Sequence, residues 1–402
     1  ATLFFDLNHY DLKQEYQGNV QALYPPSGNG QQRSTTIMKK IRQIHAWEIL
    51  DSRGNPTIAV DVRLCDGTVA TAHVPSSNDR GPVPARELRD RDPKRYRGLG
   101  VLNAVVGINC EVQEALIDQP AFDQCNIDNR LNQLDGTDDK SNLGANATLA
   151  VSLACARAAA KSRRAPLYQL IAEQCPHSYT GQLPTPLVSL ISGREHCQSS
   201  VDFKDFMIQS TAYDSVAENI RACTEIYQSL GGLLRRYRLE TSISNNGSFC
   251  PRLSNNEDAL LLIEAASAEA GYRLGSEISI AVDCGASDFY RDDRYYLHNA
   301  EQPANTQQLI SYLQELSNQF SITLIEDGMD ESDWEGWAVM SRQLNSRITL
   351  AGNELFASNP QLIAEGLSSG VANAVAIRSN NIGTLSDTLA LINAIDSSNS
   401  QT

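Results

Sequence analysis

Apolar and polar residues alternate in the segment TIAVDVRL at residues 57–64. A period of two residues is typical of a β-strand that buries one face and exposes the other. The pair Asp66-Gly67 follows and predicts a tight turn into a second strand over residues 68–74. Together with the strand-like pattern that begins at Ile41, these segments predict a β-meander.

A helical segment follows the predicted meander. Residues 146–165, NATLAVSLACARAAAKSRRA, are rich in alanine, which has the highest helix propensity. The low polarity of most of this segment indicates that the helix is buried on several sides. We therefore predict one long buried helix here.

Beyond Leu183, short apolar runs alternate with segments of helical pattern, such as residues 215–230 and 257–270. This alternation is typical of a parallel sheet or barrel, because each crossover helix returns the chain to the same edge of the sheet. The pattern therefore predicts an α/β fold. The seven candidate strands centre on residues 187–191, 206–209, 242–243, 278–282, 322–325, 348–351 and 374–377.

The composition excludes several classes of protein. The chain has 402 residues, 41% of them hydrophobic and 20% charged, which fits a globular protein of two or three domains. Its formal net charge of −15 argues against nucleic-acid binding, which relies on a surplus of lysine and arginine. No apolar run approaches the roughly 20 residues of a membrane-spanning helix, so no membrane span is predicted.

The cysteines and the first residues bear on location. Nine cysteines occur without C-x-x-C spacing, and their odd number leaves at least one unpaired in any disulfide scheme. The opening residues ATLFFDLNHYDLKQEY lack the cationic and apolar regions of a secretory signal. Both features favour a cytoplasmic location. Residues 24–36, YPPSGNGQQRSTT, indicate a linker, so residues 1–37 are predicted to form an N-terminal extension.

Several longer segments resemble the enolase family, and they occur in the order and at the spacing of that family. They are WEILDSRGNPT (47–57), LDGTDDKSNLGANATLAVSLA (134–154), VDFKDFMIQ (201–209), LIEDGMDESDW (324–334) and NNIGTLSDTLA (380–390). The resemblance runs from about Met38 to Leu391. The sequences of these segments resemble bacterial enolases more closely than animal enolases.

The resemblance implies an enolase-like TIM-type barrel preceded by an α+β cap domain. We expect the cap domain at residues 38–178 and the barrel domain at residues 179–402. The family's last barrel segment, which holds substrate phosphate and carboxylate, has no counterpart before Thr402, so we expect an incomplete barrel of about seven strands. Bare sheet edges favour aggregation, and we expect residues 2–7 or a partner chain to cover the gap.

The resemblance also implies a reaction and a cofactor. The family carries out the glycolytic dehydration of 2-phosphoglycerate to phosphoenolpyruvate, using two magnesium ions, a lysine base and a glutamate acid. Three family metal ligands correspond to Asp283, Glu326 and Asn353, each at the C-terminal end of a predicted strand. Because Asn353 offers a carbonyl oxygen without charge, we expect magnesium binding to be weakened or absent.

The loop that closes over substrate in the family corresponds to SNDRG at residues 77–81, followed by Pro82 and Pro84. Proline restricts the backbone rotation that such a closure uses. Asp79 stands where the family has a serine that ligates the second magnesium ion. It either ligates a metal from a new position or is a plain loop aspartate.

Both proton-transfer groups of the family are replaced. The base lysine corresponds to Arg378, and a guanidinium with a pKa above about 12 has essentially no deprotonated form near neutrality. The acid glutamate corresponds to Asn246, and a carboxamide cannot protonate a leaving hydroxide. Loss of one general acid or base usually costs roughly 10²- to 10⁴-fold in rate.

Three further residues correspond to positions in or beside the family's active site. His196 matches an active-site histidine, Asp205 stands where the family has a catalytic glutamate, and Lys204 replaces a glutamine. The first two are either remnants of the site or local packing residues. Lys204 is either a substitute base or a lysine that points into solvent.

The sequence favours a pseudoenzyme that retains the enolase fold and serves as a binding or structural subunit, as a homodimer or in a larger assembly. A small phosphorylated acid is expected as ligand only if the pocket still binds one. The alternative is an active magnesium-dependent lyase that uses Lys204, Asp79 and the remaining carboxylates. A decayed copy without selected function is a third reading.

Overall fold

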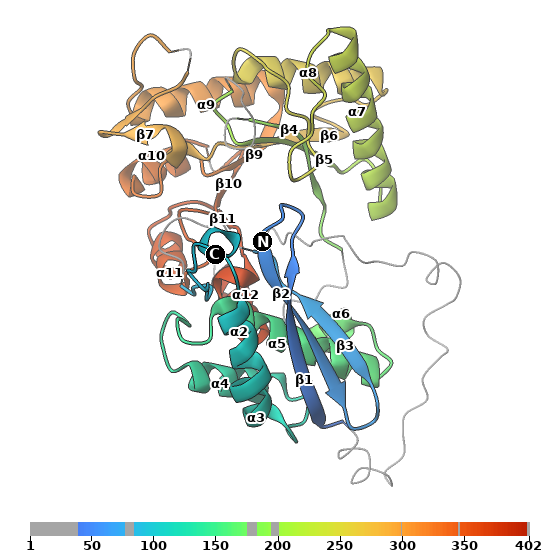
Figure 1. The fold of residues 1–402 in the computed structure, drawn as a ribbon. Coiled ribbons are helices and arrows are strands. Elements are labelled where there is room, and N and C mark those ends of the chain that lie inside the picture. The colour runs from blue at the N-terminus through green and yellow to red at the C-terminus, as the bar shows by residue number, and fades with distance from the viewer. Residues whose placement is uncertain are drawn as a thin grey trace. The chain divides into compact units, whose positions relative to one another are not determined.

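The computed structural model describes residues 39–76, 84–174, 183–193, 201–298, 300–344 and 346–399. These residues divide into two units (Figure 1). The barrel unit contains the described residues from 183 to 378. The meander unit contains residues 39–76, 85–174 and 379–399. The expected cover of the barrel gap by residues 2–7 lies outside the described residues.

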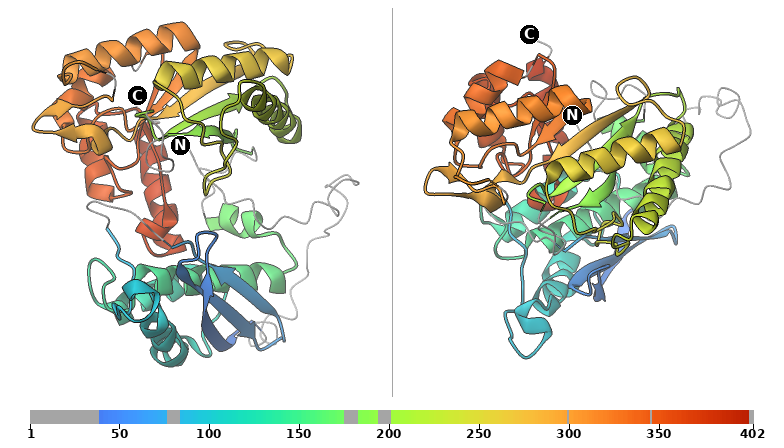
Figure 2. Two further views of the ribbon diagram at one scale, coloured as in Figure 1. Left: turned by 45° about the horizontal axis from the view of Figure 1, so that its top comes forward. Right: turned by 90° about the horizontal axis from the view of Figure 1, so that it is seen from above.

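Three antiparallel strands form the sheet of the meander unit, which confirms the predicted β-meander. They are β1 (Ile41–Leu50), β2 (Pro56–Leu64) and β3 (Val69–His73), in the order β1-β2-β3. Helix α5 (Ala145–Ser162) packs against β2 and β3 (Figure 2). Burial alternates only in the second half of β2, because its first residues, Pro56–Val60, are all buried.

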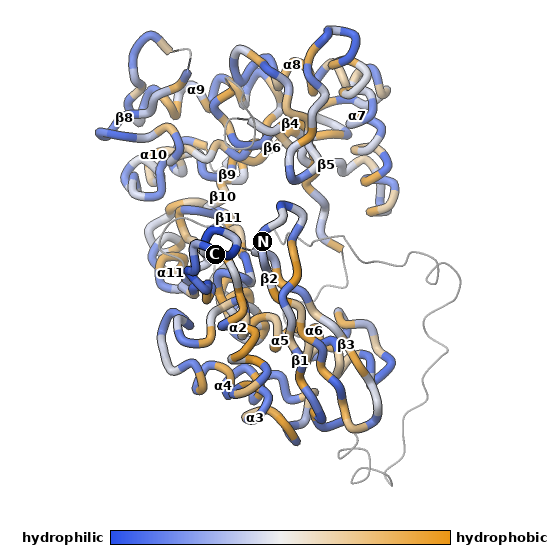
Figure 3. The backbone as a smooth tube through the Cα atoms, viewed as in Figure 1, coloured by the Kyte–Doolittle hydropathy of each residue, from blue (hydrophilic) through white to orange (hydrophobic). Residues whose placement is uncertain are grey.

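Helix α5 is the long buried helix that the alanine-rich segment predicts. It begins after Gly144, whose φ of +93° and close approach to Leu88 exclude a side chain, since a Cβ would lie 2.6 Å from the Leu88 nitrogen. Figure 3 shows hydrophobic residues along the helix, and most of them are buried in the core of the meander unit. The helix ends at Ser162, before the basic end of the predicted segment.

Several other helices of the meander unit pack beside α5, and one of them, α12 (Leu385–Asn399), follows the barrel unit along the chain. Helix α12 packs against α4 (Gln124–Asp135) and α5. The first backbone N–H groups of α12 are bonded by the other two helices: the Asp128 carboxylate accepts from Ser386 at 2.8 Å, and Ser152 Oγ accepts from Leu385 at 3.0 Å. The shorter elements are η2 (Tyr96–Gly98), α2 (Leu102–Gly107), η3 (Ile108–Val112), α3 (Gln113–Leu116), α6 (Leu167–Gln174) and η5 (Ser379–Asn381).

The barrel unit is built on a six-stranded sheet with the order β11-β10-β9-β6-β5-β4. Its strands are β4 (Leu187–Ser192), β5 (Asp205–Ser210), β6 (Ile278–Asp283), β9 (Ile322–Glu326), β10 (Thr349–Gly352) and β11 (Ala374–Val375). Its helices are α7 (Val216–Arg236), α8 (Asn256–Glu269), α9 (Thr306–Phe320), α10 (Trp334–Leu344) and α11 (Pro360–Ser368). A 3-10 turn, η4 (Ala286–Phe289), precedes a hairpin of β7 (Tyr290–Arg291) and β8 (Arg294–Tyr295).

The sheet differs from the prediction in two respects. The candidate strand at residues 242–243 forms only an isolated bridge, from Ile243 to Phe249, so the described residues contain six barrel strands where seven were predicted. In addition, β5 runs antiparallel to both β4 and β6, whereas the prediction was a parallel sheet. Two successive helices, α7 and α8, separate β5 from β6 and return the chain to the end that it left, so these neighbours run in opposite directions.

Two further expectations concern the environment of the chain. Within the described residues, no helix combines the length and apolarity needed to cross a membrane. Among the described cysteines six are free thiols, and Cys250 is disulfide-bonded. Because a disulfide is more typical of an oxidising compartment, the cytoplasmic location stays a prediction.

The segment after α4 is organised by one buried carboxylate. Asp135 is 1% exposed, and it accepts hydrogen bonds from the backbone N–H groups of Thr137 (3.0 Å), Asn142 (3.1 Å) and Leu143 (2.7 Å). Gly136, with φ of +69°, turns the chain out of the helix. The motif LDGTDDKSNLG therefore encodes a loop that closes onto its own aspartate.

We predict that Asp135→Ala lowers the free energy of unfolding by about 2–4 kcal/mol, because it leaves three backbone N–H donors, of which that of Leu143 is buried, without their acceptor. Urea unfolding followed by circular dichroism measures the change. The matched control is Asp138→Ala, since Asp138 is exposed in the same loop, and a change within about 0.5 kcal/mol is expected for it. Equal effects of the two substitutions would contradict the role of Asp135.

Candidate active site

Polar residues lie opposite one another along one edge of the barrel unit's sheet. Ser192 pairs with Asp205, Asp205 with Asp283, and Asp283 with Glu326. Residues directly opposite on neighbouring strands point to the same face. Because β5 runs against its neighbours, its first residue lies at the same edge as the last residues of β4, β6 and β9. The reversed strand therefore adds Asp205 to this face.

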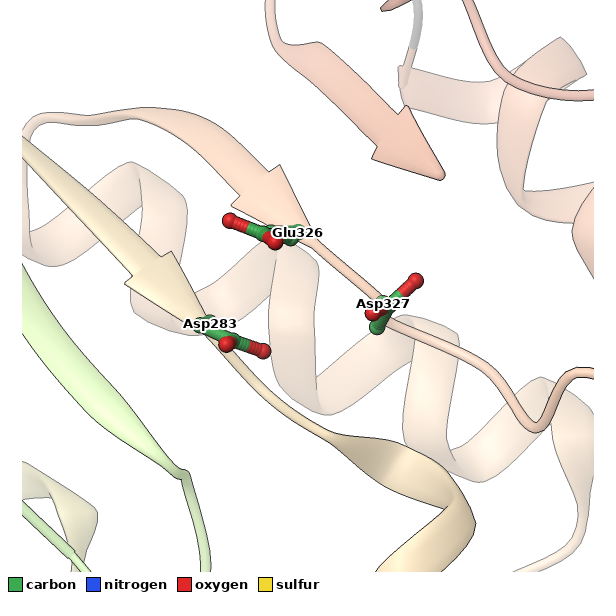
Figure 4. A group of neighbouring side chains, drawn as sticks. All are labelled: Asp283, Glu326 and Asp327. Atoms are coloured by element: carbon green, nitrogen blue, oxygen red, sulfur yellow. The ribbon is translucent and has the colours of Figure 1, made fainter. Parts of the chain in front are cut away.

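The centre of the site is a buried acidic group of Asp283, Glu326 and Asp327 (Figure 4). One carboxylate oxygen from each lies within 4.8 Å of the others, and the residues are 7%, 6% and 2% exposed. Burial raises the pKa of Asp283 well above its usual value, and the Glu326 charge raises it further. Burial, followed by the charge of Asp327, raises the pKa of Glu326 to about 7. A cation bound near these three carboxylates would therefore stabilise their ionised forms.

Asp327 was not among the predicted site residues. It forms hydrogen bonds with the two residues that follow β10. Its carboxylate accepts the backbone N–H of Asn353 at 2.9 Å and of Glu354 at 3.0 Å. Figure 4 shows the side chains of Glu326 and Asp327 leaving the chain in different directions. Burial, and then the charge of Glu354, raises the pKa of Asp327 to about 6. The only sequence signal was its place after Glu326 in the motif LIEDG.

The hydrogen bond to Asp327 fixes the backbone of Asn353, and one atom of the Asn353 side chain has no hydrogen-bond partner. The residue is 4% exposed, and its Nδ2 atom is buried without a hydrogen-bond partner. A half-turn of the carboxamide would place the carbonyl oxygen there instead, and oxygen ligands are what magnesium requires. The clustered carboxylates of Asp283, Glu326 and Asp327 are a donor set that could hold a magnesium ion, and the role of Asn353 as a further, uncharged ligand stays a prediction.

Two cations act on the acidic group. Lys204 Nζ forms an ion pair with Glu354 Oε1 at 3.2 Å. Arg378 follows β11, its backbone N–H donates to Ser358 Oγ at 2.9 Å, and its charge lowers the pKa of Glu326. The structure thus brings both predicted cations to the acidic group. Lys204 does not point into open solvent, because its side chain is 14% exposed.

Asn246, which the sequence analysis predicted to replace the catalytic acid, is hydrogen-bonded to Asp205. Asn246 Nδ2 donates to Asp205 Oδ1 at 3.1 Å, while its Oδ1 accepts from the backbone N–H of Ser248 at 3.0 Å. Asp205 also accepts from the hydroxyls of Ser189 (2.8 Å) and Ser192 (2.6 Å). Asn246 and Asp205 therefore belong to one hydrogen-bonded network. Nothing in the sequence pattern singled out Ser189 and Ser192, because both lie on β4, a segment separate from Asp205 and Asn246.

Two predicted site residues, His196 and Asp79, lie outside the described residues. The other predicted residues all belong to the barrel unit: Lys204, Asp205, Asn246, Asp283, Glu326, Asn353 and Arg378. Their assigned roles as catalytic positions and metal ligands stay predictions. The structure adds Asp327, Glu354 and the serines around Asp205 to this set.

Two family models match the chain in consecutive stretches. "Enolase, N-terminal domain" matches residues 41–171, and "Enolase, C-terminal TIM barrel domain" matches residues 180–401. The second match alone covers more than half of the 402 residues. The family and the fold class predicted from the motifs are confirmed.

We predict that Asn353→Asp tightens magnesium binding by roughly 10- to 100-fold, because it restores a carboxylate beside Asp283 and Glu326. Isothermal titration calorimetry with MgCl₂ measures the affinity. Asn305→Asp is the control, since Asn305 caps helix α9 and takes no part in the acidic group, and its affinity should equal that of the unmodified protein. Unchanged affinity in Asn353→Asp would show that this position does not face the metal.

Proposed function

Because the chain belongs to the enolase family, we propose that it is an enolase homologue that has lost most or all 2-phosphoglycerate dehydratase activity and acts as a binding or structural subunit. The observation that carries this proposal is the bonding of Asn246 to Asp205. Asn246 is the residue predicted to replace the family's acid, and its carboxamide donates a hydrogen bond to a carboxylate.

Asn246 cannot take over the task of an acid. Protonation of a leaving hydroxide needs a group that releases a proton near neutral pH, and a carboxamide does not titrate in that range. The amide donates one N–H to Asp205 and accepts from Ser248, so its two ends are already used within the network. The arrangement supports a structural role for this position.

Arg378 carries a positive charge but cannot act as a base. A guanidinium stays protonated at neutral pH, so it has no lone pair with which to remove a proton. It remains well suited to bind a carboxylate or a phosphate through two parallel hydrogen bonds. The exchange of lysine for arginine therefore supports retained ligand binding with lost proton abstraction.

Magnesium, if bound by Asp283, Glu326 and Asn353, would supply the positive charge that stabilises an anionic ligand. The site holds more carboxylates than cations among the described residues, since Asp283, Glu326 and Asp327 lie within 4.8 Å of one another. An anionic ligand is repelled by this group unless a metal ion neutralises it. We therefore expect metal and phosphorylated acid to bind together. A homodimer or a larger assembly remains part of the proposal.

The alternative function is a lyase in which Lys204 serves as the base. Only an uncharged amine accepts a proton, and a neighbouring carboxylate stabilises the charged ammonium. Lys204 lies 3.2 Å from Glu354 in this structure, which disfavours the uncharged form. The ion pair therefore supports the binding protein over the altered enzyme.

We predict that the protein with magnesium and 2-phosphoglycerate forms phosphoenolpyruvate at least about 10²-fold more slowly than a typical enzyme, whose rate is on the order of 10 s⁻¹. The double variant Asn246→Glu with Arg378→Lys should be faster than the unmodified protein by about 10-fold or more, because both proton-transfer groups return. Absorbance of the enol product follows the reaction.

The matched control for this double variant is Asn245→Glu with Arg347→Lys, which makes the same exchanges at exposed positions. No gain in turnover is expected for the control. An unmodified protein that turns over at about 10 s⁻¹ would overturn the proposal.

A second prediction concerns ligand binding. Calorimetry should detect 2-phosphoglycerate binding in the presence of MgCl₂ and at least about 10-fold weaker binding with EDTA, because the unneutralised carboxylates repel the ligand. Sulfate at the same ionic strength serves as the control for general anion binding. Equal affinity with and without magnesium would contradict the proposed metal-dependent site.

A further inference from the structure

A backbone hydrogen bond fixes Lys204 next to the acidic group. The N–H of Lys204 donates to the carbonyl of Asp283 at 2.9 Å, directly before β5 begins. The side chain then passes over Gly285, where an added Cβ would lie 3.3 Å from both Cβ and Cδ of Lys204. Gly285 has φ of +51°, so glycine suits this position in two ways. The path of the lysine stem is therefore defined by its surroundings.

The charged end of Lys204 acts on the whole acidic group. Its Nζ lies 3.2 Å from Glu354 Oε1, and the backbone N–H of Glu354 donates to the Asp327 carboxylate at 3.0 Å. The Lys204 charge also lowers the pKa values of Asp283, Glu326 and Asp327, each of which burial raises. The ammonium thus interacts with the carboxylates that would ligate a metal ion.

We propose that Lys204 is a tethered counter-ion that competes with divalent cations for the acidic group. A metal ion at Asp283 and Glu326 and the ammonium of Lys204 repel each other, and both satisfy the same negative charge. Lys204 then compensates part of the negative charge of the acidic group in the absence of metal, and the protein binds magnesium more weakly than its ligands alone would allow. The inference rests on the metal-binding part of the proposed function, not on the loss of turnover.

The test measures magnesium affinity by isothermal titration calorimetry in the full chain. Removal of the charge in Lys204→Gln or Lys204→Met should tighten binding by about 10- to 100-fold, because it removes the repulsion between the ammonium and the metal ion. Lys204→Arg keeps the charge and should bind as weakly as the unmodified protein. The matched control is Lys140→Gln, because Lys140 is 11% exposed in its side chain and pairs with Asp387 at 3.4 Å in the meander unit.

Thermal unfolding gives a second readout. Without metal, Lys204→Gln should unfold at a lower temperature than the unmodified protein, and MgCl₂ should restore it, since the metal replaces the missing cation. Lys140→Gln should lose stability without recovery in MgCl₂. Recovery in both variants would mean that magnesium acts on the whole protein and would overturn the proposal.

The possible failures are distinguishable. If Asn353→Asp binds magnesium more tightly but neither Lys204→Gln nor Lys204→Met does, the competing role of Lys204 is wrong while the metal site stands. If no variant binds magnesium at all, the metal-binding part of the proposed function fails and the inference fails with it. Tight binding by Lys204→Arg would show that side-chain shape, and not charge, limits the affinity, and would also overturn the proposal.

Discussion

The mutual repulsion of buried carboxylates at one sheet edge is the constraint on which the site of the barrel unit depends. Asp283, Glu326 and Asp327 are each less than 10% exposed, and burial, followed by the charges of neighbouring carboxylates, raises their pKa values. Such a group is stable only when cations or N–H donors compensate it. Lys204, Arg378 and the backbone amides at Asn353 and Glu354 provide this compensation.

This constraint explains how the exchanges that the sequence predicts at the catalytic positions are compatible with a stable folded site. An arginine in place of lysine retains the positive charge that Glu326 requires. An asparagine in place of glutamate removes one like charge beside Asp205 and adds an N–H donor to it. Both exchanges satisfy the electrostatics of the folded state, whereas proton transfer needs groups that titrate near neutral pH. Stability and turnover therefore place different demands on the same positions.

The sequence predicted the elements that are defined by local pattern. The alternation at Ile58–Leu64 and the turn at Asp66-Gly67 yielded the meander, and the alanine-rich segment yielded α5. The prediction that β5 runs parallel to its neighbours was wrong, because the periodicity of a strand is the same for parallel and antiparallel neighbours. Asp327 was missed because its task is to bind backbone N–H groups of a segment that lies far along the chain.

The sequence by itself determined the family, because the order and spacing of its motifs are properties of the chain alone. The replacement of the family's acid and base by Asn246 and Arg378 stays a prediction from the sequence. Only the tertiary structure decided which charges meet. Lys204 and Glu354, or Asn246 and Asp205, come from separate strands and loops, and their pairing follows from strand register and direction. Electrostatic interactions depend on the distance between charges and on their burial, and neither can be read from the amino-acid sequence.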